Sequence, residues 1–357
     1  MQHTVEQLSV DWACDLVGPA GCASHLSGMN GIVELPGGMV PFLLRAAVHL
    51  ALRTRGADLV LASSGVMAPL AWLAARRSAC PYVVWIHGLD IVYGNAVYRA
   101  LALPAIRAAH RVVANSRHTA QLAIAAGIDQ ARIRVIHPGV EAAGAIPETA
   151  TRDFAARRGL ADHPLMLFVG RLIERKGVVE FVEYVLPTIL RSCPEARFLV
   201  IGAEPGYGDR PSGPYRERIR AAAMRAGVGP AVLLAGELPD EELQLAYATA
   251  DVLAFPVIEC AGDVEGFGMA AVEAAAHGTP TVAFAVGGVP DAVSADNGVL
   301  VRPGDYAGMA AAILGVLRET GAQDSAQRCR EHAQACGWDR YGAAVRAVCR
   351  EAAGIAP

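Results

Sequence analysis

The feature that most constrains the fold is a regular alternation of short apolar runs with Ala- and Leu-rich stretches of helical length. This alternation is typical of parallel βαβ architecture. The apolar runs are continuous, as expected for strands covered on both faces of a sheet. We expect helices at 41–53, 69–77, 96–109 and 117–126, and strands at 59–62, 82–86, 112–114, 134–136, 165–169, 197–201, 232–235, 252–255, 281–284 and 298–301.

The pattern stops once and starts again, which predicts two domains. A chain of 357 residues is long enough for two cores of ~150–200 residues each. Residues 137–150 are rich in Pro, Gly and Thr and interrupt the pattern. We therefore predict an α/β fold with two Rossmann-like, doubly wound parallel-sheet domains, at 1–145 and 146–335, followed by a C-terminal helix at 336–357.

Composition excludes several classes of protein. The formal net charge of −4 argues against a nucleic-acid partner. The eight cysteines form no C-x-x-C pair and no zinc-binding spacing with His, so we expect thiols in a reducing compartment. The first residues do not resemble a signal peptide, and no apolar stretch reaches the ~20 residues that span a bilayer. These features together predict a cytoplasmic protein.

The first candidate for chemistry is the segment Leu165–Val178, LMLFVGRLIERKGV. An expected strand ends at Gly170, and Arg171 and Lys176 follow at its C-terminal end, where ligands of parallel sheets collect. Lys176 is the only lysine among 31 basic residues, although arginine could supply charge anywhere else. A planar fork and a compact ammonium together suit a diphosphate. The alternative, two solvated charges at a helix start, is disfavoured by the helix dipole.

The second candidate is the segment Asp263–Phe284, DVEGFGMAAVEAAAHGTPTVAF. Its turn, Gly266-Phe267-Gly268, opens an expected helix and offers free backbone N–H groups to an anion. Glu265 precedes the turn, and Glu273 lies inside the helix among alanines. Carboxylates on either side of a phosphate-binding turn can bind sugar hydroxyls on one side and ribose hydroxyls on the other.

The two segments together resemble the family 4 retaining glycosyltransferases of the GT-B fold. Arg171 and Lys176, followed by the E-x7-E pair Glu265 and Glu273, carry the resemblance. Supporting matches are VANS (113–116), RVIHPGV (134–140), GEL (236–238), GGVP (287–290) and WDRY (338–341). The run DVEGFGM is closest to the bacterial mannosyltransferase branch, which includes phosphatidylinositol mannosyltransferases and exopolysaccharide enzymes.

The resemblance implies a role for each site residue. Arg171 and Lys176, next to Gly170, would hold the donor diphosphate. Glu265 would bind sugar hydroxyls, Glu273 would bind the ribose, and the backbone of Gly266, Phe267 and Gly268 would support sugar and phosphate. The family's cleft histidine matches His87 in the run YVVWIHGLD. The C-terminal helix would cross back to the first domain, and the two domains would face each other across a cleft.

The expected reaction is transfer of a hexose from a nucleotide-diphosphate sugar to an acceptor hydroxyl, with retained configuration. A donor phosphate oxygen would take the acceptor proton, so no general base is required. We expect no cofactor and no metal, because Arg171 and Lys176 can neutralise the diphosphate and no DxD-like site is evident. The mannosyltransferase likeness favours GDP-mannose as donor and a lipid-linked or polysaccharide-precursor saccharide as acceptor. The base, sugar and acceptor are not fixed by sequence, and a UDP-sugar is the main alternative.

The acceptor side is less well defined by the sequence. Family members begin with a strand and a Gly-Gly loop, whereas Met1–Val10 predicts only a weak strand, so the first domain is expected to be shortened at its start. Residues 1–150 carry a charge of about +2 and residues 151–357 about −6. Five arginines near apolar helices could therefore rest on the anionic inner leaflet of the membrane, and the alternative is that they are ordinary solvated residues. They are Arg45, Arg53, Arg55, Arg76 and Arg77.

Other classes fit the sequence less well. A nucleotide-sugar epimerase or hydrolase would need an additional acid/base pair, which is not found. A nucleotide-sugar-binding protein without catalysis stays open, and donor hydrolysis without acceptor would distinguish it from an enzyme. A dehydrogenase is disfavoured because no G-x-G-x-x-G follows an expected strand.

Overall fold

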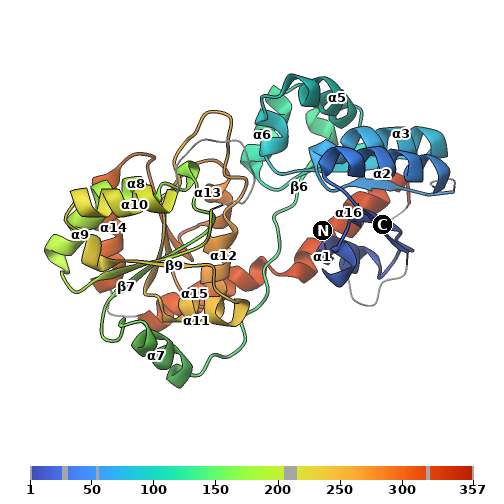
Figure 1. Cartoon of the computed structure of the whole chain (residues 1–357). Coiled ribbons are helices and arrows are strands. Elements are labelled where there is room, and N and C mark those ends of the chain that lie inside the picture. Colours follow the sequence, from blue (N-terminus) through green and yellow to red (C-terminus); the bar gives the residue numbers. More distant parts are fainter. Residues whose placement is uncertain (1, 26–30, 54–55, 205–214, 319–321, 356–357) are drawn as a thin grey trace. The chain divides into compact units, whose positions relative to one another are not determined.

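The computed structural model describes residues 2–25, 31–53, 56–204, 215–318 and 322–355. The chain forms two compact units, Met1–Gly139 together with Trp338–Pro357, and Val140–Gly337 (Figure 1). The second unit therefore starts six residues before the boundary expected from the sequence. The reason is that the side chain of Val140 is buried in the core of the second unit and its backbone bridges to Gly337.

The first unit contains a four-stranded parallel sheet in the order β3-β4-β5-β6 and a separate parallel pair, β1-β2. Its strands are β1 (Leu16–Pro19), β2 (Ile32–Leu35), β3 (Val60–Ala62), β4 (Tyr82–Ile86), β5 (Arg111–Ala114) and β6 (Ile133–Val135). Its helices are α1 (Gln2–Leu8), α2 (Met39–Arg53), α3 (Ala68–Ser78), α4 (Leu89–Val92), α5 (Ala96–Arg107), α6 (Arg117–Ala125) and α16 (Trp338–Ala353), with short 3₁₀ turns η1 (Cys22–His25), η2 (Gly65–Met67) and η3 (Gln130–Arg132).

The second unit contains a six-stranded parallel sheet in the order β12-β11-β10-β7-β8-β9. Its strands are β7 (Leu165–Val169), β8 (Arg197–Ile201), β9 (Val232–Gly236), β10 (Val252–Phe255), β11 (Thr281–Phe284) and β12 (Gly298–Val301). Its helices are α7 (Glu148–Arg157), α8 (Val178–Glu180), α9 (Leu186–Ser192), α10 (Tyr215–Arg225), α11 (Asp240–Thr249), α12 (Met269–Ala276), α13 (Val289–Ala292), α14 (Tyr306–Arg318) and α15 (Ala322–Ala335), with the short segments η4 (Glu174–Lys176), η5 (Phe181–Val185, a π turn) and η6 (Gly229–Ala231).

The strand order of the second unit indicates where a ligand would bind. The order is that of the doubly wound nucleotide-binding sheet, in which the direction of winding reverses between the first and fourth strands. Here these strands are β7 and β10, which are neighbours. Both are almost fully buried, as continuous apolar strands should be. The loops after β7 and β10 therefore meet at the point where such sheets bind ligands.

The start of the chain differs from the sequence-based expectation. Residues 2–8 form helix α1 instead of a weak strand. Thr4, Val5 and Leu8 are buried, and their i, i+1, i+4 spacing places them on one helical face. The Thr4 and Tyr341 hydroxyls are 2.6 Å apart, so α1 is held against the C-terminal helix α16. This tertiary packing overrides the weak local preference for a strand.

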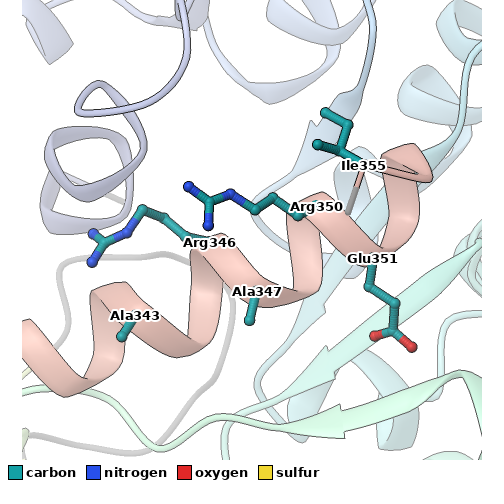
Figure 2. A pocket seen from close by; sticks show the side chains of 6 residues that line it. All are labelled: Ala343, Arg346, Ala347, Arg350, Glu351 and Ile355. Carbon is teal, nitrogen blue, oxygen red and sulfur yellow. The ribbon is translucent and has the colours of Figure 1, made fainter. Parts of the chain in front are cut away.

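Charged side chains on two sides of helix α16 bind it to the rest of the first unit. Arg350 donates to Asp11 at 2.7 Å and Arg346 donates to Gln7 at 2.8 Å. Glu351 extends away from these arginines (Figure 2) and accepts hydrogen bonds from two strand residues, Arg111 and Arg134. An open hollow of about 550 Å³ lies beside α16 and is lined by none of the expected site residues; its lining is Ala343, Arg346, Ala347, Arg350, Glu351 and Ile355.

The interaction of Glu351 with Arg111 and Arg134 makes a testable contribution to the stability of the protein in acid. Hydrogen bonds from Arg111 and Arg134 lower the pKa of Glu351 from 4.5 to about 2. A carboxyl group whose pKa is lower in the folded state stabilises that state at pH values above its unfolded-state pKa. This stabilisation is lost as the pH falls through the folded-state pKa. We therefore expect Glu351→Gln to flatten the loss of stability between about pH 4.5 and pH 2.

Urea unfolding at several pH values measures this effect. Because the Glu351 side chain is 36% exposed, the difference should be about 1 kcal/mol or less. Glu148→Gln is the control, since Glu148 pairs with Arg152 at a far more exposed site. Equal acid sensitivity of the wild-type protein and Glu351→Gln would contradict the prediction.

Candidate functional site

The loop after β7 brings the expected cations to the end of the sheet. Gly170 follows the strand, and its amide donates to the Ile201 carbonyl at 3.1 Å. Arg171 is exposed. Lys176 ends the short turn η4 and is buried, with 9% of its surface exposed. The loop is held against the segment after β10 by the Ile258 amide, which donates to the Arg175 carbonyl at 2.9 Å.

The loop after β10 supplies the expected anions and the glycine turn. Glu265 is buried, with 8% of its surface exposed, and Gly268 precedes the first turn of α12. The Gly288 amide donates to the Glu265 carbonyl at 2.8 Å. A Cβ atom on Gly288 would lie 2.1 Å from the Gly266 carbonyl oxygen, so the two backbones touch. The backbone of Gly288 therefore holds the turn Gly266-Phe267-Gly268 in place.

The two loops meet in a cluster of four charged side chains, of which Arg175, Lys176 and Glu265 are buried and Asp263 is partly exposed. Lys176 Nζ donates to Glu265 Oε2 at 2.7 Å, and Arg175 Nη1 bonds the same oxygen. Arg175 Nε forms an ion pair with Asp263 Oδ1 at 3.2 Å. Two cations and two carboxylates balance, which is the condition for holding charges away from water.

Lys176 and Glu265 lie on loops, but both are buried, and each compensates the charge of the other. Removing either charge therefore changes the charge balance of the cluster, although Arg175 still compensates Glu265 when Lys176 is removed.

Arg175 and Asp263 were not among the residues singled out from the sequence. The signal that could have found Arg175 is its place beside Lys176 in a short segment bounded by apolar residues and Gly177. Asp263 lies two residues before Glu265, which in an extended segment places both side chains on one face. Neither signal is specific by itself, because the pairing joins residues about 90 apart in the chain.

The environment of Lys176 weakens its hold on its proton. Burial lowers the pKa of Lys176, and the positive charges of Arg175 and Arg171 lower it further, while Glu265 opposes the shift. Lys176 Nζ also lies 4.8 Å from the centre of the Phe255 ring, a cation–π distance. An added anion would therefore favour the charged form of this amine.

Glu273 is not part of this cluster. It lies inside α12 and accepts a hydrogen bond from the Tyr247 hydroxyl of α11 at 2.7 Å. Tyr247 is almost fully buried, and this burial, with Glu273 nearby, raises the pKa of the phenol well above its usual value. Tyr247 therefore stays a hydrogen-bond donor and fixes the orientation of the Glu273 carboxylate.

His87 lies in the first unit, directly after the buried strand β4, and is exposed. Its Nε2 is 3.0 Å from the Ser63 carbonyl oxygen. Its amide donates to Asp90 at 2.7 Å, and the Gly65 amide donates to the other Asp90 oxygen at 2.8 Å. Asp90 thus ties together the ends of β3 and β4 and orients the His87 backbone.

Two further properties concern the described part of the chain only. Within it, His, Cys, Asp and Glu side chains nowhere gather in a group of three that could hold a metal ion. None of the described helices combines the length and apolar character needed to span a bilayer.

Family models match both units of the chain. A model described as Glycosyl transferases group 1 matches residues 163–319. A model described as Glycosyltransferase Family 4 matches residues 23–143. The first match includes Arg171, Lys176, Glu265 and Glu273, and the second includes His87.

Named relatives include two actinobacterial proteins. D-inositol 3-phosphate glycosyltransferase of Xylanimonas cellulosilytica is 33% identical, over 89% of this chain and 78% of that protein. The GDP-mannose-dependent alpha-(1-6)-phosphatidylinositol monomannoside mannosyltransferase of Mycolicibacterium smegmatis is 32% identical, over 64% of this chain and 59% of that protein. Among solved structures, Anabaena HepE in complex with UDP-glucose is similar with a TM-score of 0.74 and 20% identity, over 91% of this chain and 86% of HepE.

Proposed function

The chain belongs to glycosyltransferase family 4 and has the GT-B fold, and from this premise we propose that it moves mannose from GDP-mannose to an acceptor hydroxyl with retained configuration. That the chain is a glycosyltransferase follows from its family. The observation that carries the proposal for the site is the Lys176–Glu265 contact beside the turn Gly266–Gly268, at the switch point of the sheet. A cation and a carboxylate there match the two halves of a nucleotide sugar, its diphosphate and its hydroxyl-bearing ring.

Each donor group has a proposed partner in the second unit. Arg171 and Lys176 bind the diphosphate and stabilise the charge that develops on it as the bond to the sugar breaks. Glu265 accepts hydrogen bonds from sugar hydroxyls. Gly170 and the backbone of Gly266, Phe267 and Gly268 let the donor approach the main chain. Glu273, oriented by Tyr247, accepts hydrogen bonds from the ribose hydroxyls.

His87 has a proposed role in binding the sugar. A neutral His87 that donates from Nε2 to the Ser63 carbonyl presents Nδ1 as an acceptor. An acceptor nitrogen fits a sugar hydroxyl better than a phosphate oxygen. We therefore assign His87 to a sugar hydroxyl, and chemistry otherwise proceeds by positioning and charge stabilisation, with a donor phosphate oxygen taking the acceptor proton.

A panel of donors tests the proposal directly. Thermal unfolding is measured with GDP-mannose, UDP-glucose and UDP-N-acetylglucosamine, each in buffer with EDTA because Arg171 and Lys176 are proposed to replace a metal. At about 100 times Kd, GDP-mannose should raise Tm by roughly 5 °C or more. A UDP-sugar that stabilises the protein while GDP-mannose does not would replace the proposed donor. That alternative is supported by the UDP-glucose bound to HepE.

The acceptor is proposed to be a lipid-linked saccharide or a polysaccharide precursor at the cytoplasmic face of a membrane. The phosphatidylinositol monomannoside in the name of one relative supports this class of acceptor. Helix α2 in the first unit supports it further, because Val40, Leu44, Val48 and Leu52 recur at every fourth residue and are each more than 60% exposed. Such a stripe suits the boundary between lipid headgroups and acyl chains.

Basic side chains accompany this apolar stripe. Arg45 is exposed on α2, and Arg76 and Arg77 lie in the last turn of α3, which packs against α2. Arg55 and the side chain of Arg53 lie outside the described residues. A groove of about 290 Å³ between the two helices is lined by apolar side chains and Arg77. Apolar insertion with flanking arginines favours an anionic bilayer.

Vesicle sedimentation measures the membrane contact. Leu44→Glu with Val48→Glu should reduce binding to phosphatidylglycerol-containing vesicles by about 10-fold or more, because both apolar side chains would leave the interface. Val97→Glu is the control, since Val97 is equally exposed but lies on α5, outside the stripe. Vesicle binding that is unaffected by the double substitution, or that ignores salt, would contradict this part of the proposal.

A further inference from the structure

Arg175 is a buried charged residue without a role in the proposed transfer. Only 5% of its surface is exposed, and it lies between the carboxylates of Glu265 and Asp263. Its backbone is also fixed, because its carbonyl accepts a hydrogen bond from Ile258. A buried guanidinium in a fixed place between two carboxylates needs an explanation, since burying charge is costly unless the pairing is complete.

Lys176 has two competing partners, Glu265 and the proposed donor diphosphate. In this structure the Lys176 ammonium is committed to Glu265 at 2.7 Å. The proposed function requires the same ammonium to bind the donor diphosphate. If Lys176 turned away from Glu265 and nothing replaced it, a carboxylate would be left buried and uncompensated, which is strongly unfavourable. Without a second cation, Glu265 would therefore compete with the donor for Lys176.

Arg175 supplies that second cation on the same oxygen. Both Arg175 Nη1 and Lys176 Nζ bond Glu265 Oε2. We propose that Arg175 is a positioning residue that keeps Glu265 compensated, so that Lys176 is released to the donor diphosphate when a nucleotide sugar binds. The inference rests on the proposed function for Lys176 and goes beyond it, because it assigns a role to a residue that does not touch the donor.

Asp263 completes the arrangement. Its Oδ1 pairs with Arg175 Nε and also accepts a hydrogen bond from the Val264 amide at 2.8 Å. The guanidinium is thereby held at one end by Asp263 while its other end reaches Glu265. Because both cations use Oε2 of Glu265, the second oxygen, Oε1, is the one left for a sugar hydroxyl. Arg175 thus orients Glu265 as well as neutralising it.

A double-mutant cycle on nucleotide binding tests this role without relying on transfer activity. The variants are Arg175→Met, Glu265→Gln and the two combined, and the probes are GDP and UDP, titrated separately by calorimetry. Arg175→Met should weaken binding of the preferred nucleotide about 10-fold or more. Without Arg175, Lys176 is the one remaining cation on Glu265 in this cluster, so it stays paired with Glu265 and does not bind the diphosphate. Glu265→Gln alone should bind as well as the wild-type protein or better. The double variant should return to within about 3-fold of the wild-type affinity.

Recovery in the double variant is what a merely structural role would not produce. If Arg175 served only to shape the loop or contacted the phosphate itself, the double variant would bind as weakly as Arg175→Met, and the inference would be overturned. Wild-type affinity in Arg175→Met would overturn it as well. If the wild-type protein bound neither GDP nor UDP, the proposed donor site would fail instead, so the two failures are distinguishable.

Two further variants control for folding. Arg225→Met removes an arginine from an exposed ion pair with Glu183 in the same unit and should leave nucleotide binding unchanged. Arg175→Lys keeps the charge but not the fork, and should bind within about 3-fold of wild type. If Arg175→Met does not fold, Arg175→Lys and the double variant decide, since neither leaves the buried Glu265 carboxylate without a second cation that it needs. Weak binding by both folded proteins would then contradict the inference.

Discussion

Replacing Lys176 with alanine is expected to reduce the rate of sugar transfer by about 10²-fold or more, because the compact charge proposed to stabilise the leaving diphosphate is lost. Glu265→Gln should cause a loss of similar size, since a neutral amide cannot accept hydrogen bonds from sugar hydroxyls with the strength of a carboxylate. Lys176→Arg should not restore the rate, because a planar fork does not fit a site built for a point charge. Initial rates of transfer with the preferred donor measure all three effects.

The cluster geometry determines the controls for this experiment. Lys176→Ala leaves Glu265 paired with Arg175, so this variant should stay folded, although Lys176 is buried. Melting curves of each variant check that point. Arg220→Ala removes an exposed charge that pairs with Glu217 and should keep full activity. A Lys176→Ala protein with more than half of the wild-type rate would refute the assignment of Lys176 to the donor.

The sequence predicted the sheets well because most of their strands are buried continuous apolar runs; β12, at the sheet edge, is partly exposed. The expected strands at 82–86, 165–169, 197–201, 252–255, 281–284 and 298–301 coincide with β4, β7, β8, β10, β11 and β12. A continuous apolar run flanked by Gly or Pro has few alternatives in such a chain. The predicted family, the α/β fold class and the assignment as a glycosyltransferase are likewise confirmed.

The start of the chain was less predictable from local pattern. Helix α1 depends on its contacts with α16, and the sequence separation between Thr4 and Tyr341 leaves no local signal for the pairing. The parallel pair β1-β2 was missed as well, since its strands have four residues each and are only partly buried. Short elements stabilised by distant partners carry little periodicity of their own.

The sequence singled out candidate site residues one by one, but it could not predict the contacts between them. Spacing and chemistry identified Lys176 and Glu265, and the structure brings them to 2.7 Å. Nothing in the sequence pointed to Tyr247 as the hydrogen-bond partner of Glu273. Arg175 was missed because its importance arises only when the loop after β7 is pressed against the loop after β10. Gly177 permits that approach, because a Cβ atom there would clash with the Pro256 carbonyl.

Gly177→Ala is expected to destabilise the second unit by about 3 kcal/mol or more and to reduce transfer strongly. Gly177 has a φ of +67°, a conformation that alanine adopts only at a cost. A Cβ atom there would also lie 1.9 Å from the Pro256 carbonyl oxygen, so the two loops must move apart. Arg175 and Lys176 immediately precede this residue, and they would move away from Glu265 together.

Gly227 provides a control that separates the two costs of the Gly177 substitution. Its φ of +68° is almost the same, but a Cβ atom added there meets nothing within 4 Å. Gly227→Ala should therefore cost only the ~1–2 kcal/mol of the left-handed conformation and leave transfer unchanged. Urea unfolding and initial transfer rates of the two variants give the comparison. Equal losses of stability would mean that backbone conformation alone sets the requirement for glycine at 177, and that the close packing of the two loops does not hold the charged cluster in place.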